Sequence, residues 1–139
     1  MGSEPLQLII DISWVAAYGV GGDEIDAEHG QLFRMLDRMR AAYATKQEKF
    51  CLSLIKEFAG AIRTHFEREE AIFTKLSYPG AERHVAQHAV LALRVEAISE
   101  AAGHTPMARR TLADLIDGLA VVVMTDHLTL DLELRRYLS

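Results

Sequence analysis

Four long stretches with a helical repeat of apolar side chains, separated by short clusters of turn formers, constrain the fold of this chain more than any other feature. Ala, Leu, Glu and Arg, all good helix formers, dominate these stretches, and strand signals are nearly absent. Clear breaks lie at 19–22, 77–80 and 103–106, and the polar residues 45–47 form a weaker one. We therefore predict four helices, at about residues 26–44, 48–76, 81–102 and 106–137.

Short connections make consecutive helices antiparallel neighbours, so the predicted fold class is all-α, an up-down-up-down four-helix bundle. Asp26 can cap the first predicted helix, and Pro106 suits the first turn of the fourth, where a missing N–H costs nothing. Residues 1–25 are predicted to form a non-helical N-terminal arm. A chain of 139 residues with half of them apolar fits a single domain, 1–139, with the bundle at 26–137.

Charge and composition exclude several classes of protein. The formal net charge of -5 argues against a nucleic-acid binder, which normally presents a basic face to phosphates. The single cysteine, Cys51, cannot form an internal disulfide, which fits a reducing compartment. The longest apolar runs, such as 119–124, are far shorter than the roughly 20 residues that span a bilayer, and the N-terminus lacks the basic start of a secretory signal. We therefore expect a cytoplasmic protein without membrane or nucleic-acid partners.

Five of the six histidines fall on inward positions of the predicted helices, which recur every three or four residues, and every helix contributes at least one. Glu69 occupies another inward position, and either Leu130 or Asp131 occupies the last one of the fourth helix. A lone buried histidine is usually a hydrogen-bonded core residue. Unpaired buried polar groups cost on the order of 1–3 kcal/mol each, so a small core does not collect this many unless something binds them. The inward histidines are His29, His65, His84, His88 and His127.

Their positions along the helices place all five histidines at one end of the bundle, because antiparallel packing brings the start of one helix level with the end of the next. His84 and His88 are four residues apart, share a helix face and can bind one ion together. His65 and Glu69 have the same spacing, and the carboxylate can bridge to a second ion. Imidazole and carboxylate donors in these numbers suit a pair of borderline ions such as iron better than magnesium or calcium.

Four motifs, in order along nearly the whole chain, resemble those of bacterial hemerythrins. They are the run from Trp14 to His29 and the segments 65–70, 78–88 and 127–131. The resemblance implies a di-iron centre in which Glu69 and Asp131, together with an oxo or hydroxo group, bridge the two ions. The histidine ligands that it implies are His84, His88 and His127 for one iron, and His29 and His65 for the other.

The resemblance further implies reversible dioxygen binding at the two-histidine iron, for storage, for delivery, or for sensing with a separate partner protein. The alternative is a di-iron enzyme acting on peroxide, nitric oxide or a C–H bond. Oxygen-activating bundles use mostly carboxylates with Glu-x-x-His pairs, whereas this sequence has none and offers no acid–base residue beyond the ligands. We therefore expect binding rather than catalysis. A purely structural metal site needs only four ligands, fewer than the seven inward ones here, while a sensing module stays open.

The chain departs from the hemerythrin pattern at three positions. Asp131 follows His127 by four residues, where the family usually has five. Four residues rotate about 40° around a regular helix and five rotate about 140°, so a spacing of five needs a distortion such as a π-bulge. We therefore predict that Asp131 bridges from a straighter fourth helix. Val123 stands where an aromatic residue is common, which we expect to widen the oxygen pocket, and Glu28 replaces a glutamine.

Three further residues have less specific predictions. His104 lies in a Gly-His-Thr-Pro turn and is expected to be a solvated loop residue. Cys51 is expected to be a small core residue rather than a redox sensor. Glu70, beside Glu69, is expected on a solvated helix face, and a supporting role next to the metal ligands stays open.

Overall fold

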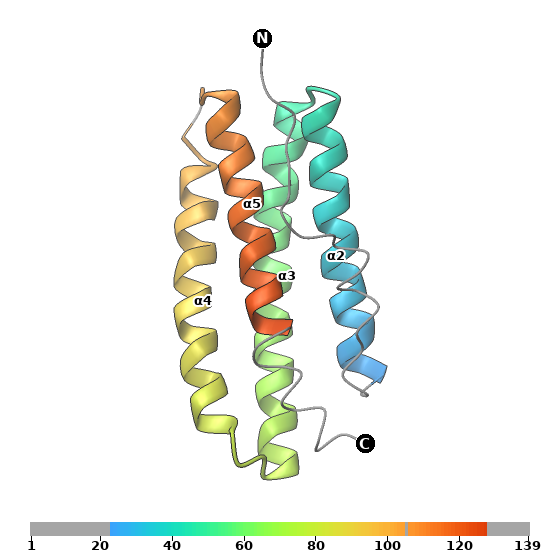
Figure 1. Cartoon of the computed structure of the whole chain (residues 1–139), viewed down its shortest axis with the longest axis vertical. Coiled ribbons are helices and arrows are strands. Elements are labelled where there is room, and N and C mark those ends of the chain that lie inside the picture. The colour runs from blue at the N-terminus through green and yellow to red at the C-terminus, as the bar shows by residue number, and fades with distance from the viewer. Residues whose placement is uncertain (1–22, 105, 128–139) are drawn as a thin grey trace.

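The computed structural model describes residues 23–104 and 106–127, with side chains from residue 27 onward. Four helices run side by side in alternating directions along one long axis (Figure 1). Their bounds are α2 Asp23–Ala44, α3 Glu48–Leu76, α4 Ala81–Ala101 and α5 Arg109–Thr125.

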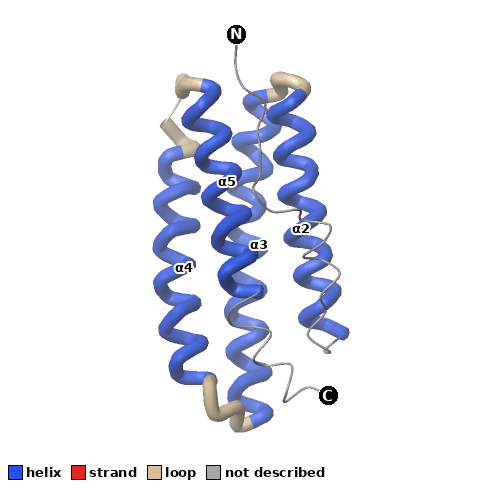
Figure 2. Tube along the Cα trace, viewed as in Figure 1, coloured by secondary structure: helices blue, strands red, loops and turns tan. Residues whose placement is uncertain are grey.

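The helices form a closed ring in which each one packs against two neighbours. The main contacts join α2 to α3, α3 to α4, α4 to α5 and α5 to α2. The connections are short and lie at the two ends of the bundle (Figure 2). The predicted all-α, up-down-up-down bundle is confirmed, and the α3 boundaries match the prediction to the residue.

The inward apolar positions predicted from the helical repeat make up the core. Large side chains from three helices, among them Leu36, Phe58 and Leu119, have no exposed surface. Cys51 is also fully buried, with its Sγ 3.6 Å from the carbonyl of Met39, as expected for a small core residue. Ala81 and Ile98, which continue the repeat of His84, His88 and Leu91 toward the two ends of α4, are only partly buried. The core thus follows the predicted stripes except at the ends of α4.

Two helices, α2 and α5, start at other residues than predicted. Helix α2 begins at Asp23, so the non-helical arm predicted for 1–25 is wrong for its last three residues, and 1–22 lie outside the described residues. Asp26 lies inside the first turn of α2 and is therefore not its N-terminal cap. Pro106 was predicted in the first turn of the fourth helix, but α5 starts only at Arg109, after an extended Ala108.

The weak polar break at 45–47 is a tight turn that closes α2. Lys46 adopts a left-handed backbone, with φ of 60°, and the Gln47 N–H donates to the carbonyl of Ala42 at 2.8 Å. Ser77 ends α3 in the same way, with φ of 51° and a bond from the Tyr78 N–H to the carbonyl of Phe73. Both ends use the turn that usually takes glycine, which explains why the sequence signal at 45–47 is weak.

The chain continues past Thr125 into a π-helical turn at Asp126 and His127. The prediction of a straighter fourth helix is therefore wrong within the described residues. Such turns widen the helix locally and are frequent at functional sites. The predicted extension of this helix from 128 to 137 lies outside the described residues.

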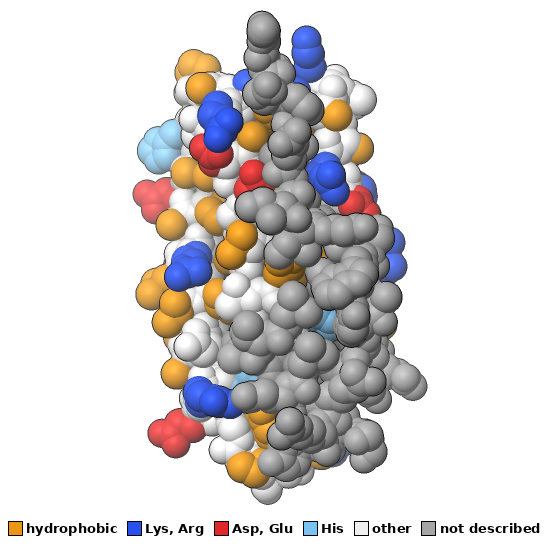
Figure 3. All heavy atoms as spheres, viewed as in Figure 1, with side chains coloured by type: hydrophobic (Ala, Val, Ile, Leu, Met, Phe, Trp, Pro, Cys, Tyr) orange, Lys and Arg blue, Asp and Glu red, His pale blue; other side chains and the backbone are white. Residues whose placement is uncertain are grey.

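Arg109 joins the start of α5 to the end of α2 at the upper end of the bundle. Its guanidinium donates to the carbonyl of Tyr43 at 2.7 Å and lies 3.9 Å from the centre of the Tyr43 ring. The Tyr43 carbonyl also accepts from the Lys46 N–H at 3.1 Å, and a cation at the C-terminal end of a helix interacts favourably with its exposed carbonyls. Among the described residues, no helix combines the length and apolar content needed to cross a bilayer. On the part of the surface coloured in Figure 3, acidic and basic side chains are interspersed.

Candidate metal centre

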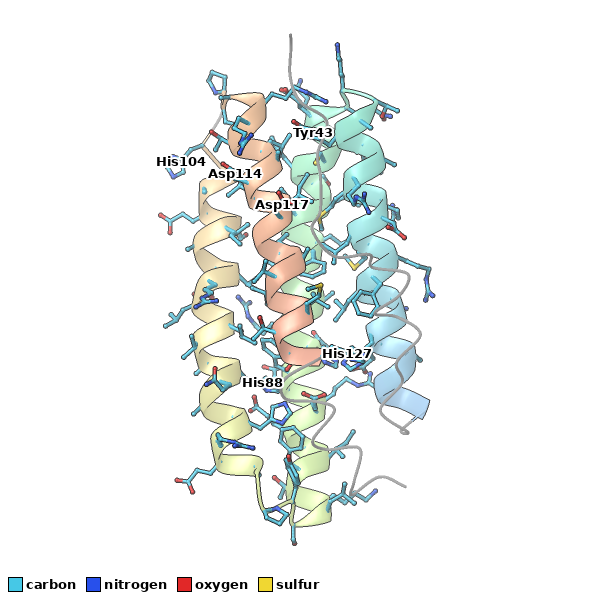
Figure 4. All side chains as sticks on the ribbon, in the orientation of Figure 1. Tyr43, His88, His104, Asp114, Asp117 and His127 are labelled. Atoms are coloured by element: carbon cyan, nitrogen blue, oxygen red, sulfur yellow. The ribbon has the colours of Figure 1, made fainter. Side chains whose placement is uncertain are left out.

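The five predicted histidines come together inside the lower half of the bundle, where Figure 4 labels His88 and His127. All four helical segments contribute, as the helical repeat predicted. Each of the five is at most 3% exposed, and Glu69, one turn after His65 on α3, is 1% exposed. His104 is exposed on the loop after α4 at the opposite end, which confirms its expected place outside the cluster.

Two groups of donor atoms within this cluster are compact enough to hold one ion each. In each group the candidate ligand atoms lie within 4.8 Å of one another. Two carboxylates, Glu69 and Asp126, belong to both groups. The histidines that complete them are His29 and His65 in one group and His84 and His88 in the other.

The two shared carboxylates face the histidines in the same sense. Oδ1 of Asp126 lies 2.9 Å from Nε2 of His88, whereas its Oδ2 lies 3.3 Å from Nε2 of His65. Oε1 of Glu69 likewise lies 2.9 Å from Nε2 of His88, and its Oε2 lies 3.7 Å from Nε2 of His65. Each carboxylate thus directs one oxygen to the α4 histidines and the other to the opposite group.

The donor set fits a pair of metal ions. Both oxygens of Glu69 are buried. Oε1 lies 2.9 Å from Nε2 of His88, but the described residues are not oriented to donate a well-directed hydrogen bond to either oxygen. Nitrogen and oxygen ligands lie about 2.1 Å from a borderline divalent metal ion, so two neighbouring ligands at right angles are about 3 Å apart. The 2.9 and 3.3 Å separations from Glu69 to His88 and His84 have this size. The side chains are therefore spaced like ligands of a shared ion.

Two outer carboxylates orient the rings of the cluster. Oε1 of Glu28 lies 2.9 Å from Nδ1 of His65, and Oε2 of Glu70 lies 2.9 Å from Nδ1 of His88. In both rings Nε2 is then left to face the shared carboxylates. Glu70 is about one-third exposed, so the supporting role left open by the sequence agrees with its contact. Outer contacts of this kind fix the tautomer and orientation of a metal-binding imidazole.

In the metal-free chain, the neighbouring imidazoles stabilise the ionised forms of the two shared carboxylates. Burial opposes ionisation of Asp126, but hydrogen bonds from His65, His84 and His88 hold the pKa of this carboxyl well below its usual range. Burial and the charge of Asp126 likewise oppose ionisation of Glu69, yet the neighbouring imidazoles lower its pKa to about 2. Both acids are therefore ionised at neutral pH and available as ligands.

The histidines fall into two groups, those whose pKa is raised and those whose pKa is lowered. Burial alone would lower the pKa of His65, but the hydrogen bond to Asp126 and the charge of Glu69 raise it to about 9. The same two carboxylates overcome burial at His88 and raise its pKa to about 10. Burial, with the neighbouring rings of His65 and His127, lowers the pKa of His29 to about 4. Metal ions would therefore displace protons from His65 and His88 but not from His29.

His127 lies beside His29 rather than beside the histidines of α4. Its Nδ1 is 3.1 Å from Nδ1 of His29, and the two rings meet edge to face with centres 4.6 Å apart. The ligand set implied by the resemblance put His127 with His84 and His88. Among the described residues, His127 belongs to neither donor group. Asp131, the second bridging residue expected from the resemblance, lies outside the described residues.

Aromatic side chains cover the histidines of α4. Phe66 stacks on His88 with ring centres 4.0 Å apart, and Phe73 packs on His84 at 4.4 Å. Both phenylalanines are at most 4% exposed. Their rings exclude water from this side of the cluster, which strengthens electrostatic interactions inside it.

The family of this chain follows from its sequence. The family model described as the hemerythrin HHE cation binding domain matches residues 20–131. The chain belongs to the hemerythrin family. This confirms the resemblance drawn from the motifs, and the match spans every described helix of the bundle.

Individual relatives of the hemerythrin family are distant. The bacteriohemerythrin of Stenotrophomonas maltophilia (strain R551-3) is 28% identical over 82 residues, 59% of this chain and 54% of that protein. The hemerythrin-like proteins of Naegleria gruberi and Naegleria fowleri are each 25% identical over 76 residues, which cover 55% of this chain and 59% of theirs. The matched segments thus span little more than half of these relatives. No solved structure matches the chain significantly.

Sequence reasoning missed Asp126. The residue precedes His127, and the repeat of three or four residues assigned one inward position at this end of the helix, which was given to His127. The signal in the sequence was an acidic residue close behind the apolar run 119–124, with only Thr125 between them. Glu28 was noted as a departure from the family pattern, but its contact with His65 was not predicted.

Proposed function

We propose that this chain binds dioxygen reversibly at a non-haem di-iron centre and serves oxygen storage, delivery or sensing. The observation that carries this proposal is that two compact donor groups share the carboxylates of Glu69 and Asp126. Shared carboxylates couple two ions in one site, which a mononuclear or purely structural site does not require. Membership in a cation-binding family and the name bacteriohemerythrin of one relative support it.

Iron is the metal that we propose, since imidazole and carboxylate donors together suit borderline ions. The proposed ligands are the seven residues that the resemblance implies: His29, His65, Glu69, His84, His88, His127 and Asp131. When bound, iron supplies the electrons and the open coordination position that dioxygen binding requires. The chain contributes buried rings held at their Nδ1 atoms and an aromatic cover that excludes water.

Binding rather than catalysis is favoured by what surrounds the cluster. Glu28 and Glu70 contact its histidines, and each has one carboxylate oxygen 2.9 Å from an imidazole Nδ1. A general acid or base must reach a proton of the substrate, and these two carboxylates orient ligands instead. The histidine-rich donor set is also less anionic than that of oxygen-activating bundles. We therefore propose that the protein is not an enzyme.

The test is an oxygen titration of the iron-loaded protein. The metal-free chain is loaded with ferrous iron without air, its iron content is measured, and visible spectra are followed while oxygen is admitted and then removed. Two iron ions per chain and charge-transfer bands that disappear on deoxygenation support the proposal. A matched pair of variants locates the site: His84→Ala should lose iron, whereas His104→Ala, on the exposed loop, should bind it as the parent does.

Two results would contradict dioxygen binding. A chain that binds no iron lacks the proposed centre altogether. Irreversible oxidation, accompanied by turnover of added peroxide or nitric oxide, would favour the alternative di-iron enzyme. Peroxide consumption is therefore measured in the same samples, with the His84→Ala variant as the control for free iron.

A further inference from the structure

Asp126 is a buried carboxylate whose described partners are all imidazoles. It is 1% exposed and lies within 3.6 Å of Nε2 atoms of His65, His84 and His88. Moving a charge into a protein interior costs several kcal/mol unless it is closely paired. A chain that needed only a packed core at this position would keep an apolar residue there, as at Val122 and Val123, so the carboxylate itself requires an explanation.

The local backbone allows Asp126 and His127 to be buried together. Val122 and Val123 are both buried in the regular part of α5, because consecutive residues point about 100° apart and can face different helices, and the same holds for Asp126 and His127. The latter two are each 1% exposed, and both lie in the π-helical turn that follows α5. Asp126 lies toward α3 and α4, with its oxygens near His65 and His88, while His127 lies against His29 on α2.

Asp126 repeats the geometry of Glu69 from the opposite side of the cluster. Its two oxygens divide between His88 and His65, as the two oxygens of Glu69 do. Of the described residues, only these two carboxylates belong to both donor groups. A bridging carboxylate places one oxygen on each ion, and the arrangement of both side chains fits this mode.

The family pattern leaves a place for this carboxylate. The bridging aspartate is expected five residues after the last histidine, but Asp131 follows His127 by only four. We propose that Asp126 supplies the second bridging carboxylate, in the role that the resemblance assigns to Asp131. This inference rests on the proposed di-iron function and changes the identity of one of its ligands. The centre is then held by a shared pair, Glu69 and Asp126, with the π-helical turn as the element that presents the second member.

The test measures metal binding rather than oxygen chemistry. Metal-free protein is titrated without air with ferrous iron and, in parallel, with cobalt(II), whose visible spectrum reports its ligands. The parent chain should bind two ions. Asp126→Asn keeps the shape of the side chain but removes the charge, and we expect it to lose one ion or bind it at least about tenfold more weakly.

Two matched variants accompany it. Asp131→Asn tests the residue that the family pattern favours, and Asp117→Asn makes the same change on α5, away from the cluster (Figure 4). Both should bind two ions with the affinity of the parent. Asp126→Glu, which keeps a carboxylate, should recover much of the binding that Asp126→Asn loses, with a changed cobalt spectrum.

An Asp126→Asn variant that binds both ions like the parent overturns the proposal, and so does loss of an ion by Asp131→Asn alone. If Asp126→Asn fails to fold, as judged by circular dichroism, Asp126→Glu decides: a changed cobalt spectrum supports the assignment and an unchanged one overturns it. A parent chain that binds two ions but no dioxygen would end the proposed function while leaving this assignment intact. A parent that binds no ions would end both.

Discussion

Oε1 of Glu28 lies 2.9 Å from Nδ1 of His65, so the other nitrogen of this ring faces the two shared carboxylates. Glu28 is also paired with Arg68 at the surface of the bundle. The residue before the first histidine of the chain thus controls the orientation of a histidine on the next helix. Because a carboxylate makes an imidazole more basic than an amide does, its presence should strengthen metal binding.

We expect Glu28→Ala to weaken metal binding by about 10- to 100-fold, since outer contacts to ligand histidines typically have effects of this size. Glu28→Gln keeps an acceptor for the ring and should have a smaller effect. Competition with a chelator of known affinity measures both. Glu57→Ala, an exposed change on α3, serves as the control. Equal affinities for Glu28→Ala and Glu57→Ala would show that this contact does not support the site.

Metal binding should become weaker as the pH falls from about 10 toward 6. The pKa values of His65 and His88 in the metal-free chain are raised to about 9 and about 10, so an ion must displace protons from both. Each displaced proton contributes up to about a tenfold loss of affinity per pH unit below its pKa. His29, with its pKa lowered to about 4, contributes nothing in this range. Calorimetry in two buffers of different ionisation enthalpy counts the released protons, and release of none at pH 7 would contradict the prediction.

Gly60 and Gly80 should respond oppositely to the same substitution. A Cβ added at Gly60, in the middle of α3 beside a half-open pocket of about 250 Å³ that reaches His65, has no atom within 4 Å. Gly60→Ala should therefore raise the free energy of unfolding by about 1 kcal/mol through helix propensity. At Gly80 the added Cβ would lie 2.7 Å from Oη of Tyr78. Gly80→Ala should therefore lower the free energy of unfolding by about 1–3 kcal/mol. Urea unfolding of the metal-free variants gives both values, and a shared sign would refute the close approach of Tyr78.

Arg109→Ala should lower the free energy of unfolding by about 1.5–3 kcal/mol, because it removes a charged hydrogen bond to the carbonyl of Tyr43 and a contact with its ring. Arg109→Lys should recover only part of this loss, since an ammonium group does not stack and bond as a guanidinium does. Thermal unfolding measures both variants. Arg110→Ala removes only an exposed ion pair with Asp114 and should change stability by less than about 1 kcal/mol.

The helical repeat predicted most of the fold and most of the cluster because both depend on one periodicity. His29, His65 and His84 had to face inward once the helices were placed, and the structure buries all three. The end of α2 at Ala44 was predicted to the residue, although Lys46 in the following turn adopts a left-handed conformation for which lysine carries no sequence signal. The fourth helix was predicted to start at Pro106, three residues before its observed start. Proline is tolerated in the first turn of a helix, but its presence does not show that a helix starts there.

Asp126 was not predicted from the repeat, since a stripe of one residue every three or four leaves out neighbours that face another helix of the bundle. A periodicity of 3.6 residues assigns one inward position near the end of α5, and His127 already occupied it. The contacts of Glu28 and Glu70 were equally hidden, because each reaches a histidine on a neighbouring helix rather than on its own. Interactions between helices, unlike the faces of single helices, depend on rotations that a sequence does not specify.

The cluster and the Arg109–Tyr43 contact hold opposite ends of one bundle. In the metal-free chain, the end with the cluster encloses carboxylates and imidazoles, whereas the buried side chains described near Tyr43 are mostly apolar. We expect amide hydrogens around 65–69 and 84–88 to exchange with solvent sooner than those near Tyr43, and added metal to abolish the difference. A chain that has lost its ions would then open at one end and become a preferred target for proteolysis, which would couple the lifetime of the protein to its metal content.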